Sequence, residues 1–366
     1  MWKTEWGNNV TSIEGLKPYL NLKDMEQLGE VTDRHPMSIP KYYLDLIDKE
    51  DPNDPIKILS VPSLMELDMS GDYDTSGEAE NTKFAGLQHK YATTMLVLTT
   101  NACFMYCRHC FRKRMVGYSN NEINNRLDMT IDYLEAHPEV NNALLTGGDS
   151  FCLDTSVIKM YLERMTEVEH LDFIRFGTRA PVVFPQRIYE DKELIEALKE
   201  ASKKKNVMII TQFNHPKELT EEVMKAMDAL REAGVTVNNQ TVLLKGVNDD
   251  PKILGELLNK LVRFGINPYY VFQCRPVTAV KNHFQLPLLD TWRIAEEAKA
   301  YCNGMSKRFK LIMSHPRGKV EIIGAIEDEM IFRFHQAKSP EDMGKMFKCK
   351  LDPKGRWLDK DLQFID

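Results

Sequence analysis

Short apolar runs alternate with longer amphipathic segments from about residue 95 onward. The runs are rich in β-branched and aromatic residues, and the segments between them, roughly 10 to 18 residues long, have the apolar spacing of helices. The predicted strands are residues 95–100, 142–146, 173–177, 207–211, 236–244, 269–273 and 311–314. Repeated strand–helix units of this kind predict a parallel sheet with right-handed crossovers.

About six such repeats are enough for the sheet to curl into a full or partial barrel, with its chemistry at the carboxyl ends of the strands. We therefore predict an α/β fold, with a partial (β/α)6 barrel over residues 91–325. A flat, doubly wound sheet is the alternative, although the chain has no Gly-x-Gly-x-x-Gly turn.

Two extensions flank the predicted barrel. Residues 1–90 form an N-terminal helical extension, with a helix at 16–28, a turn at 51–55 and no separate core. Residues 326–366 form a short C-terminal tail, in which Ser339 followed by Pro340 predicts the start of a helix.

Composition narrows the class of protein. With 366 residues, of which 43% are hydrophobic and 28% charged, the chain can bury a full core. A net charge of −6 and a pI near 5.9 argue against binding to nucleic acid or to an anionic membrane. The apolar runs are too short to span a bilayer, and seven cysteines, an odd number, suit a reducing compartment, so we expect a cytoplasmic protein.

Three of the cysteines form a Cys-x-x-x-Cys-x-x-Cys motif, Cys103, Cys107 and Cys110, directly after the first predicted barrel strand. Thiolates at this spacing can bind three irons of a [4Fe–4S] cluster and leave the fourth iron open. The amino and carboxylate groups of S-adenosylmethionine can chelate an open iron, and one electron can then cleave its adenosyl C–S bond to a 5′-deoxyadenosyl radical. A zinc site is the alternative, but zinc usually takes four ligands, and His109 is too close to the cysteines to bind with them.

Two neighbouring features fit the same site. Tyr106 suits packing near an adenine, although ordinary loop packing would also explain it. Residues 144–149 end a predicted strand with two glycines and Asp149, so the backbone can approach a ligand and the carboxylate can receive an ammonium group.

These motifs resemble the lysine 2,3-aminomutase family, as do further stretches of the chain. The similar stretches are residues 105–114, 145–149, 175–187, 213–216, 239–249 and 268–274. The resemblance implies a [4Fe–4S] cluster, reversible use of S-adenosylmethionine, and a pyridoxal phosphate that carries the migrating amino group. It also implies homo-oligomers and an electron donor such as flavodoxin or ferredoxin.

The resemblance assigns roles to individual residues. Those implied to contact S-adenosylmethionine are His109, Gly148, Asp149, Arg179 and Gln240. Arg112 is implied to pair with the substrate carboxylate, and Lys319 to bond pyridoxal phosphate. The positions implied to bind the cofactor's phosphate are Lys90, Tyr91 and Thr94, where the family has two arginines and a tyrosine. Only one cation remains among them, and Arg317 could supply another.

The chain departs from the family pattern in its substrate residues. The family's two aspartates for the ε-ammonium of lysine are replaced by Arg275 and Ser314, and a cation cannot pair with an ammonium group. We therefore expect an amino acid other than lysine, with an acidic one such as glutamate as a candidate; a salt bridge between Arg275 and a nearby acid is the alternative.

Other family features are also altered. The glycine-rich loop before Lys319 is shortened to residues 316–318, Asp250 stands where the family has a zinc-binding cysteine, and the tail keeps only Cys349. Cys152, Cys274 and Cys302 are expected to be small packed side chains.

Three functional hypotheses follow. The first is an aminomutase that moves an amino group from Cα to Cβ of a pyridoxal-bound α-amino acid by a radical route. The second keeps the radical chemistry but loses pyridoxal phosphate, with Arg112 and Arg275 holding another anionic substrate. The third is a non-catalytic iron–sulfur electron-transfer or binding protein. A nucleic-acid role is not expected, because the basic stretch 108–114 is assigned to the substrate end of the site.

Overall fold

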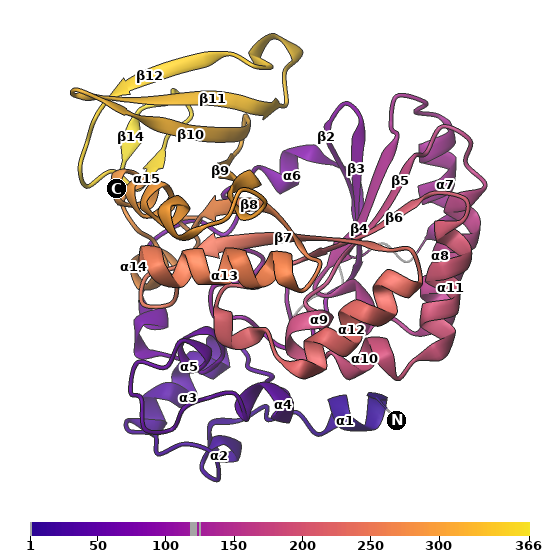
Figure 1. Ribbon diagram of the computed structural model, residues 1–366, viewed down its shortest axis with the longest axis horizontal. Helices are drawn as coiled ribbons and strands as arrows, with labels where there is room; N and C mark the ends of the chain where they lie inside the picture. Colours follow the sequence, from indigo (N-terminus) through magenta and orange to yellow (C-terminus); the bar gives the residue numbers. More distant parts are fainter. Residues whose placement is uncertain (1, 118–122, 124–125) are drawn as a thin grey trace.

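The computed structural model describes residues 2–117, 123 and 126–366, and its central feature is a 12-stranded sheet whose strands follow one another in sequence order (Figure 1). The strands are β1 (Thr82–Phe84), β2 (Leu87–Tyr91), β3 (Thr94–Thr100), β4 (Asn142–Gly147), β5 (Phe173–Gly177), β6 (Asn206–Thr211), β7 (Thr236–Leu243), β8 (Asn267–Gln273), β9 (Lys310–His315), β10 (Gly318–Ile326), β11 (Glu329–Ala337) and β12 (Met346–Lys350). A separate two-stranded sheet pairs β13 (Trp357–Leu358) with β14 (Phe364–Ile365).

Strands β3 to β9 are parallel, and each pairs with the next. They coincide with the seven predicted strands, so the α/β prediction is confirmed. At the two edges β3 pairs with β2 and β9 with β10, both antiparallel, so the parallel strands form an open, partial barrel.

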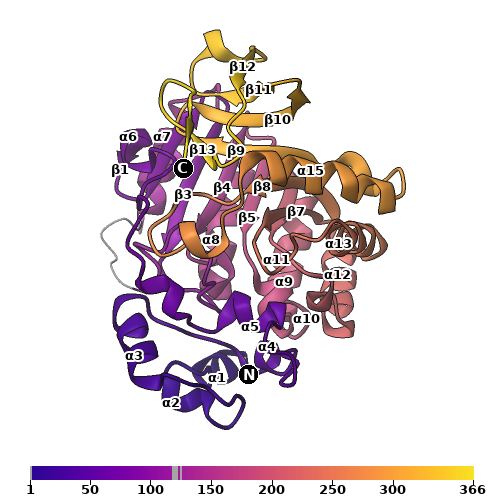
Figure 2. The ribbon, with the colours of Figure 1, turned by 90° about the vertical axis from the view of Figure 1, so that its left-hand side faces the viewer.

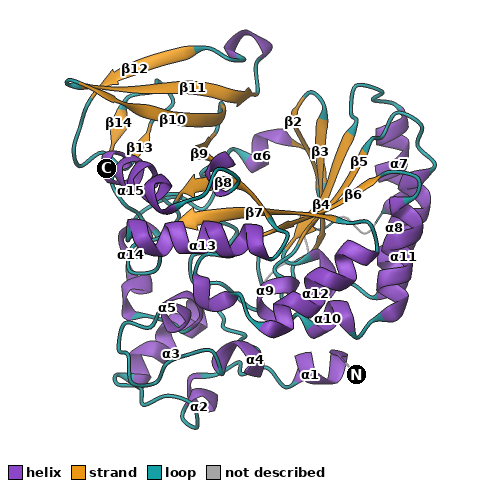
Figure 3. Cartoon of the chain, viewed as in Figure 1, coloured by secondary structure: helices purple, strands orange, loops and turns teal. Residues whose placement is uncertain are grey.

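Helices cover the outer face of this sheet (Figure 3). They are α7 (Leu127–Glu135), α8 (Thr155–Thr166), α9 (Ala180–Val183), α10 (Gln186–Tyr189), α11 (Lys192–Ser202), α12 (Glu221–Glu232), α13 (Pro251–Arg263) and α15 (Leu288–Ala298). The short helix α14 (Lys281–Phe284) lies instead beside the N-terminal extension. Helix α13 shows how the sequence specifies them: Asp250 caps it by accepting from the Lys252 amide, Pro251 opens it, and leucines at three- and four-residue spacing are buried.

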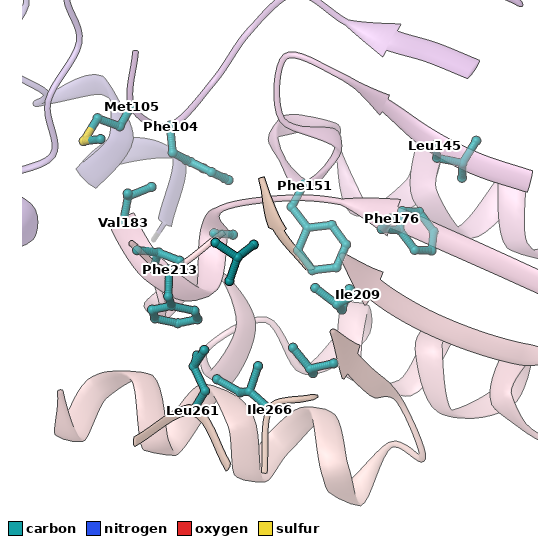
Figure 4. Close-up of a cluster of buried hydrophobic side chains, with 14 of the residues drawn as sticks. Phe104, Met105, Leu145, Phe151, Phe176, Val183, Ile209, Phe213, Leu261 and Ile266 are labelled. Carbon is teal, nitrogen blue, oxygen red and sulfur yellow. The ribbon is translucent and has the colours of Figure 1, made fainter. Parts of the chain in front are cut away.

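The N-terminal extension packs on the same hydrophobic core as the barrel. Its helices are α1 (Trp2–Gly7), α2 (Ile13–Leu16), α3 (Met25–Arg34), α4 (Lys41–Leu44), α5 (Pro55–Ser60) and α6 (Glu78–Asn81). Phe104 of the cysteine loop stacks on Phe184 and also contacts Trp6. Figure 4 shows Phe104 and Met105 in one cluster with Phe151, Phe176 and Phe213 from the barrel.

The predicted helix at 16–28 is wrong. Helix α2 ends at Leu16, because Pro18 has no amide hydrogen to continue the helical ladder. Asp24 then adopts a left-handed conformation at φ 54°, and a new helix, α3, begins only at Met25.

The C-terminal residues extend the sheet beyond β9 as an antiparallel β10–β11–β12 meander, at the opposite end of the molecule from helices α1 to α5 (Figure 2). The predicted helix start at Ser339 is only a single 3₁₀ turn, Pro340–Asp342, and Ser339 makes no side-chain cap. No helix of the described residues is long and apolar enough to cross a membrane.

Candidate active site

A cavity of about 400 Å³ lies on the concave face of the open sheet. It is lined by alternate residues of the parallel strands, such as Leu96, Leu144 and Gln240, whose neighbours in the sequence are buried under the helices. The cysteine loop after β3 closes one end, and Lys319 lies at the other. The cavity therefore joins residues that are more than 200 positions apart in the sequence.

The three clustered cysteines all line this cavity as free thiols. Arg179 donates from Nη1 to Cys107 Sγ at 2.7 Å, and its Nη2 is 2.7 Å from Glu218 Oε1. Burial, followed by the neighbouring Cys107, raises the pKa of Cys110 to about 11, so an unliganded thiol stays protonated and releases its proton when it binds metal. No group of three or more His, Cys, Asp or Glu side chains in the described ranges is placed to hold a single metal ion.

The two glycines after β4 let the 147–149 loop pack directly on the cysteine loop. The Gly148 amide donates to Thr100 O at 2.6 Å and the Asp149 amide to Ala102 O at 2.8 Å. A Cβ on Gly147 would lie 2.3 Å from Thr100 O, and one on Gly148 would lie 2.2 Å from Ala102 O. Glycine is required here by close backbone approach.

Substituting Gly148→Ala is therefore expected to displace the cysteine loop and to lower the iron content after anaerobic reconstitution. Overpacking of this kind costs about 1–3 kcal/mol in the free energy of unfolding. Chemical denaturation and iron analysis measure the two effects. Gly304→Ala is the matched control, because a Cβ there meets no atom within 4 Å; equal iron content in the two variants would contradict the assignment.

The residues implied to contact S-adenosylmethionine surround the cysteine end of the cavity. The Asp149 carboxylate is buried and accepts from the amides of Phe151 (3.0 Å) and Arg179 (2.8 Å), and burial raises its pKa. His109 Nε2 lies 3.0 Å from Gln212 Nε2, while its buried Nδ1 has no hydrogen-bond partner in the described part of the chain. Gln240 points into the cavity from β7.

Two buried glutamates from the N-terminal extension neutralise the basic stretch 108–114. Glu66 accepts from Arg108 (2.5 Å) and Lys113 (2.7 Å), and Glu78 accepts from Arg112 (2.8 Å) and Arg114 (2.6 Å). The sequence alone predicts that this stretch serves the substrate, and it does not predict either acid as its partner. Glu66 had one visible signal, the Ser63-x-x-Glu66 capping box, which by itself indicates only a helix start.

Replacing Glu66 with glutamine is expected to destabilise the protein by about 3–5 kcal/mol, because it leaves two buried cations without their partner. Although burial alone raises the pKa of Glu66, Lys113 and Arg108 lower it to about 2. A depressed carboxyl pKa stabilises the fold above the unfolded-state pKa, and that contribution is lost as the pH falls from about 4.5 towards 2. Denaturant unfolding at pH 7 and pH 3 tests this. The difference in the free energy of unfolding between the unsubstituted protein and Glu66→Gln should be smaller at pH 3. Exposed Glu200→Gln is the control.

Arg112 lines the cavity, but most of its donors are already used. Its Nε and Nη2 bond Glu78, and its Nη1 donates to Gly147 O at 3.2 Å and Thr146 Oγ1 at 3.3 Å. Of five guanidinium N–H groups, one is left over. A bidentate grip on a substrate carboxylate therefore does not fit this arrangement without displacement of Glu78.

Lys319 lies on β10, paired with Ser314 of β9, and projects into the cavity. Its Nζ lies 5.3 Å from the ring centroids of both Tyr91 and Tyr270 and donates to Gln336 Oε1 at 2.9 Å. Burial, followed by the charges of Arg175, Lys90 and Arg275, lowers the pKa of Lys319 to about 7.

A group of cations surrounds this end of the cavity. Lys90 donates to the carbonyls of Ser76 (3.1 Å) and His315 (2.9 Å), and burial lowers its pKa to about 7. Arg175 projects from β5, and its buried Nε has no hydrogen-bond partner in the part of the chain that the structure describes. Together with Arg275, these side chains favour an anionic ligand.

Arg275 follows β8 and faces the cavity beside Ser314. It donates to Ser76 Oγ and Ser314 Oγ, both at 2.9 Å, and its guanidinium lies 4.2 Å from the ring centroid of Phe111. Within residues 2–117, 123 and 126–366, no carboxylate forms a salt bridge with it, so the structure does not show the salt bridge considered as an alternative. Burial lowers the pKa of Arg275 to about 10, which leaves it charged at neutral pH.

Some predicted residues lie elsewhere. Arg317 does not line the cavity and pairs with Asp342 at 2.7 Å, so the suggestion that it supplies a second phosphate cation is wrong. Tyr106 also lies outside the lining, and its ring packs on Gly117, as in ordinary loop packing. Asp250 caps α13, and Cys349 donates to Leu362 O, far along the C-terminal meander. Cys152, Cys274 and Cys302 are buried and packed, and Cys274 also borders the cavity.

An open parallel barrel with three clustered thiols facing its cavity is typical of radical S-adenosylmethionine enzymes. In agreement, the family model described as "Radical SAM superfamily" matches residues 97–257. The chain is 38% identical over 354 residues to "Putative L-lysine 2,3-aminomutase" of Aquifex aeolicus (strain VF5), covering 94% of each chain. It is 37% identical to L-lysine 2,3-aminomutase of Clostridium subterminale, covering 83% of this chain and 73% of that one. It is 36% identical to glutamate 2,3-aminomutase of Clostridioides difficile (strain 630), covering 83% and 72%.

The chain belongs to the lysine 2,3-aminomutase family of radical S-adenosylmethionine enzymes. It is therefore an isomerase that uses a [4Fe–4S] cluster and S-adenosylmethionine and acts on a small molecule. The hypothesis of a non-catalytic iron–sulfur protein is set aside.

Proposed function

We propose that the protein moves the amino group of an α-amino acid other than lysine from Cα to Cβ while pyridoxal phosphate holds that group, with glutamate as the first candidate. The observation that carries the proposal is that one cavity holds both an amine with a lowered pKa, Lys319, and a buried arginine, Arg275, that forms no salt bridge with a carboxylate of the described residues. A glutamate 2,3-aminomutase among the relatives supports this choice.

At the cysteine end, we assign Cys103, Cys107 and Cys110 as ligands of three cluster irons. Three protein thiols leave one iron open for S-adenosylmethionine. Asp149 can accept the ammonium group of S-adenosylmethionine with the carboxylate lone pairs that its two amide bonds leave free. Arg179 donates to Cys107, and Gly148 lets the 147–149 loop pack directly on the backbone of the cysteine loop.

At the other end, pyridoxal phosphate, when bound, supplies an aldehyde that captures an amino group and a conjugated ring that delocalises an unpaired electron. Because its pKa is lowered to about 7, Lys319 is uncharged at neutral pH far more often than an ordinary lysine, and only the uncharged amine is a nucleophile. Tyr91 and Tyr270 provide flat walls beside it. Lys90 and Arg175 offer positive charge for the phosphate.

Arg275 would then receive the carboxylate of the substrate side chain. Its two Nη atoms donate to the hydroxyls of Ser76 and Ser314, and these neutral groups can rotate to accept from the arginine or donate to a bound anion. A lysine side chain would bring its ammonium group against this arginine, and like charges in a buried site cost several kcal/mol. In this proposal a small electron donor, such as flavodoxin or ferredoxin, reduces the cluster.

The test is anaerobic reconstitution with iron, sulfide and pyridoxal phosphate, borohydride reduction, and mass mapping of the adduct. An adduct on Lys319, followed by conversion of glutamate but not lysine to a β-amino acid, is the expected result. An intact cluster with no adduct would instead favour a radical reaction without pyridoxal phosphate. One observation points in that direction: the Lys90 amine already bonds two backbone carbonyls.

A further inference from the structure

An irregularity in the C-terminal meander turns a glutamine toward Lys319. Strands β10 and β11 pair Lys319 with Gln336 but Val320 with Phe334, so His335 is an extra residue, a β-bulge, on β11. In a regular strand Gln336 would share a face with Phe332 and Phe334, which are buried. The bulge places Gln336 instead on the same face as His335.

Gln336 lines the cavity, and His335 contacts Tyr270, whose ring lies beside the Lys319 amine. Gln336 Oε1 accepts from Lys319 Nζ at 2.9 Å, and His335 Nε2 lies 2.9 Å from the Tyr270 hydroxyl. The strands approach closely here, since a Cβ on Gly318 would lie 2.2 Å from Gln336 O. The position of Gln336 is thus fixed by backbone geometry and not only by its own flexible side chain.

We propose that Gln336 is a positioning residue that aims the Lys319 amine into the cavity and, as a neutral acceptor, stabilises its ammonium form less than a carboxylate would. The C-terminal meander is then part of the active site. The role in cofactor capture rests on the proposed function, but the hydrogen bond itself does not.

The neutrality of the Gln336 acceptor matters because the Lys319 amine lies among the cations Arg175, Lys90 and Arg275. A carboxylate at this distance would offset the nearby cations and keep the amine protonated, while an apolar side chain would leave the amine free to rotate away. An amide oxygen accepts a hydrogen bond from either protonation state of the amine and adds no net charge. Of the common acceptors of this length, glutamine meets both requirements.

The titration of Lys319 is measured without added cofactor, on the full chain and on three of its variants. Lys319 is labelled with a small amine-reactive anhydride across a pH series, and mass mapping gives the midpoint of its titration relative to Lys159, an exposed lysine of α8 that does not line the cavity. Gln336→Glu changes charge at nearly constant shape, and Gln336→Met removes the acceptor at constant length. Arg333→Leu, on the same strand, is the control, since its partner Glu321 does not line the cavity.

We expect Gln336→Glu to raise the Lys319 midpoint by about one pH unit or more. The rate of borohydride-trapped adduct formation with pyridoxal phosphate should fall at pH 7 and recover at higher pH. Gln336→Met should lower the midpoint and slow adduct formation by about 10- to 100-fold, without recovery at higher pH, because the amine is misplaced and not protonated. Arg333→Leu should change neither quantity.

An unchanged midpoint and an unchanged rate in both Gln336 variants would overturn the proposal. If Gln336→Met does not fold, the isosteric Gln336→Glu still tests the proposal, because an unchanged Lys319 midpoint in that variant would overturn it. If the Lys319 midpoints shift in a protein that forms no adduct, Gln336 is still supported as the residue that positions Lys319, and only the use of pyridoxal phosphate is overturned. Failure of the Gln336 proposal and failure of the proposed function therefore give different results.

Discussion

Replacing Cys107 with alanine is expected to abolish both assembly of the iron–sulfur cluster and cleavage of S-adenosylmethionine. The variant keeps only two of the three clustered thiols, Cys103 and Cys110, and a cubane held by two ligands has no stable site. It also leaves the Arg179 guanidinium without the sulfur that it contacts at 2.7 Å. Iron and sulfide analysis, visible absorbance, and release of 5′-deoxyadenosine from the reduced protein measure the loss, which should reach background.

The matched control is Cys302→Ala. Cys302 is also a free thiol, but it is buried against α13 and does not line the cavity. It should keep the full iron content and the full cleavage rate. A Cys107 variant that still cleaved S-adenosylmethionine would show that the cluster is bound elsewhere, and the assignment of the cavity would fail with it.

The parallel strands could be predicted because each is a short apolar run next to a helix with a clear period, and both signals are local. The errors lie where local signals are weak. The N-terminal extension contains several helices of four to six residues, too short to show a period, and the 16–28 prediction read through a proline. The meander after β9 was missed because charged residues alternate with its apolar positions, as they also do in ordinary surface segments.

Those parts of the candidate site that lie within short sequence motifs could be predicted. The cysteines and the Gly-Gly-Asp turn stand within short stretches, and the structure brings them to one cavity. Glu66, Glu78 and Gln336 could not be found in this way, because each acts on a residue far away in the sequence: Glu78 on Arg112 and Gln336 on Lys319. A single glutamate or glutamine has no sequence signature for a contact that only tertiary packing creates.

The second large effect is expected at Arg275. Substituting Arg275→Gln should lower kcat/KM for glutamate by about two to three orders of magnitude, because loss of one partner of a buried charge pair costs about 2–5 kcal/mol and each 1.4 kcal/mol is a factor of ten. Arg275→Glu should reduce it further and should make a cationic substrate such as lysine the better of the two. Competition between the two amino acids in one reaction measures the preference directly.

Arg317→Gln is the matched control, because this arginine pairs with Asp342 outside the cavity. It should leave the substrate preference unchanged. The comparison also separates two causes of lost activity. If Arg275→Gln lowers kcat/KM for every amino acid equally, then Arg275 serves the shape of the cavity through Phe111, Ser76 and Ser314 and not the charge of the substrate. If the loss is confined to acidic substrates, the guanidinium itself selects the anion, since uncharged amino acids of similar size would fit the cavity equally well in both proteins.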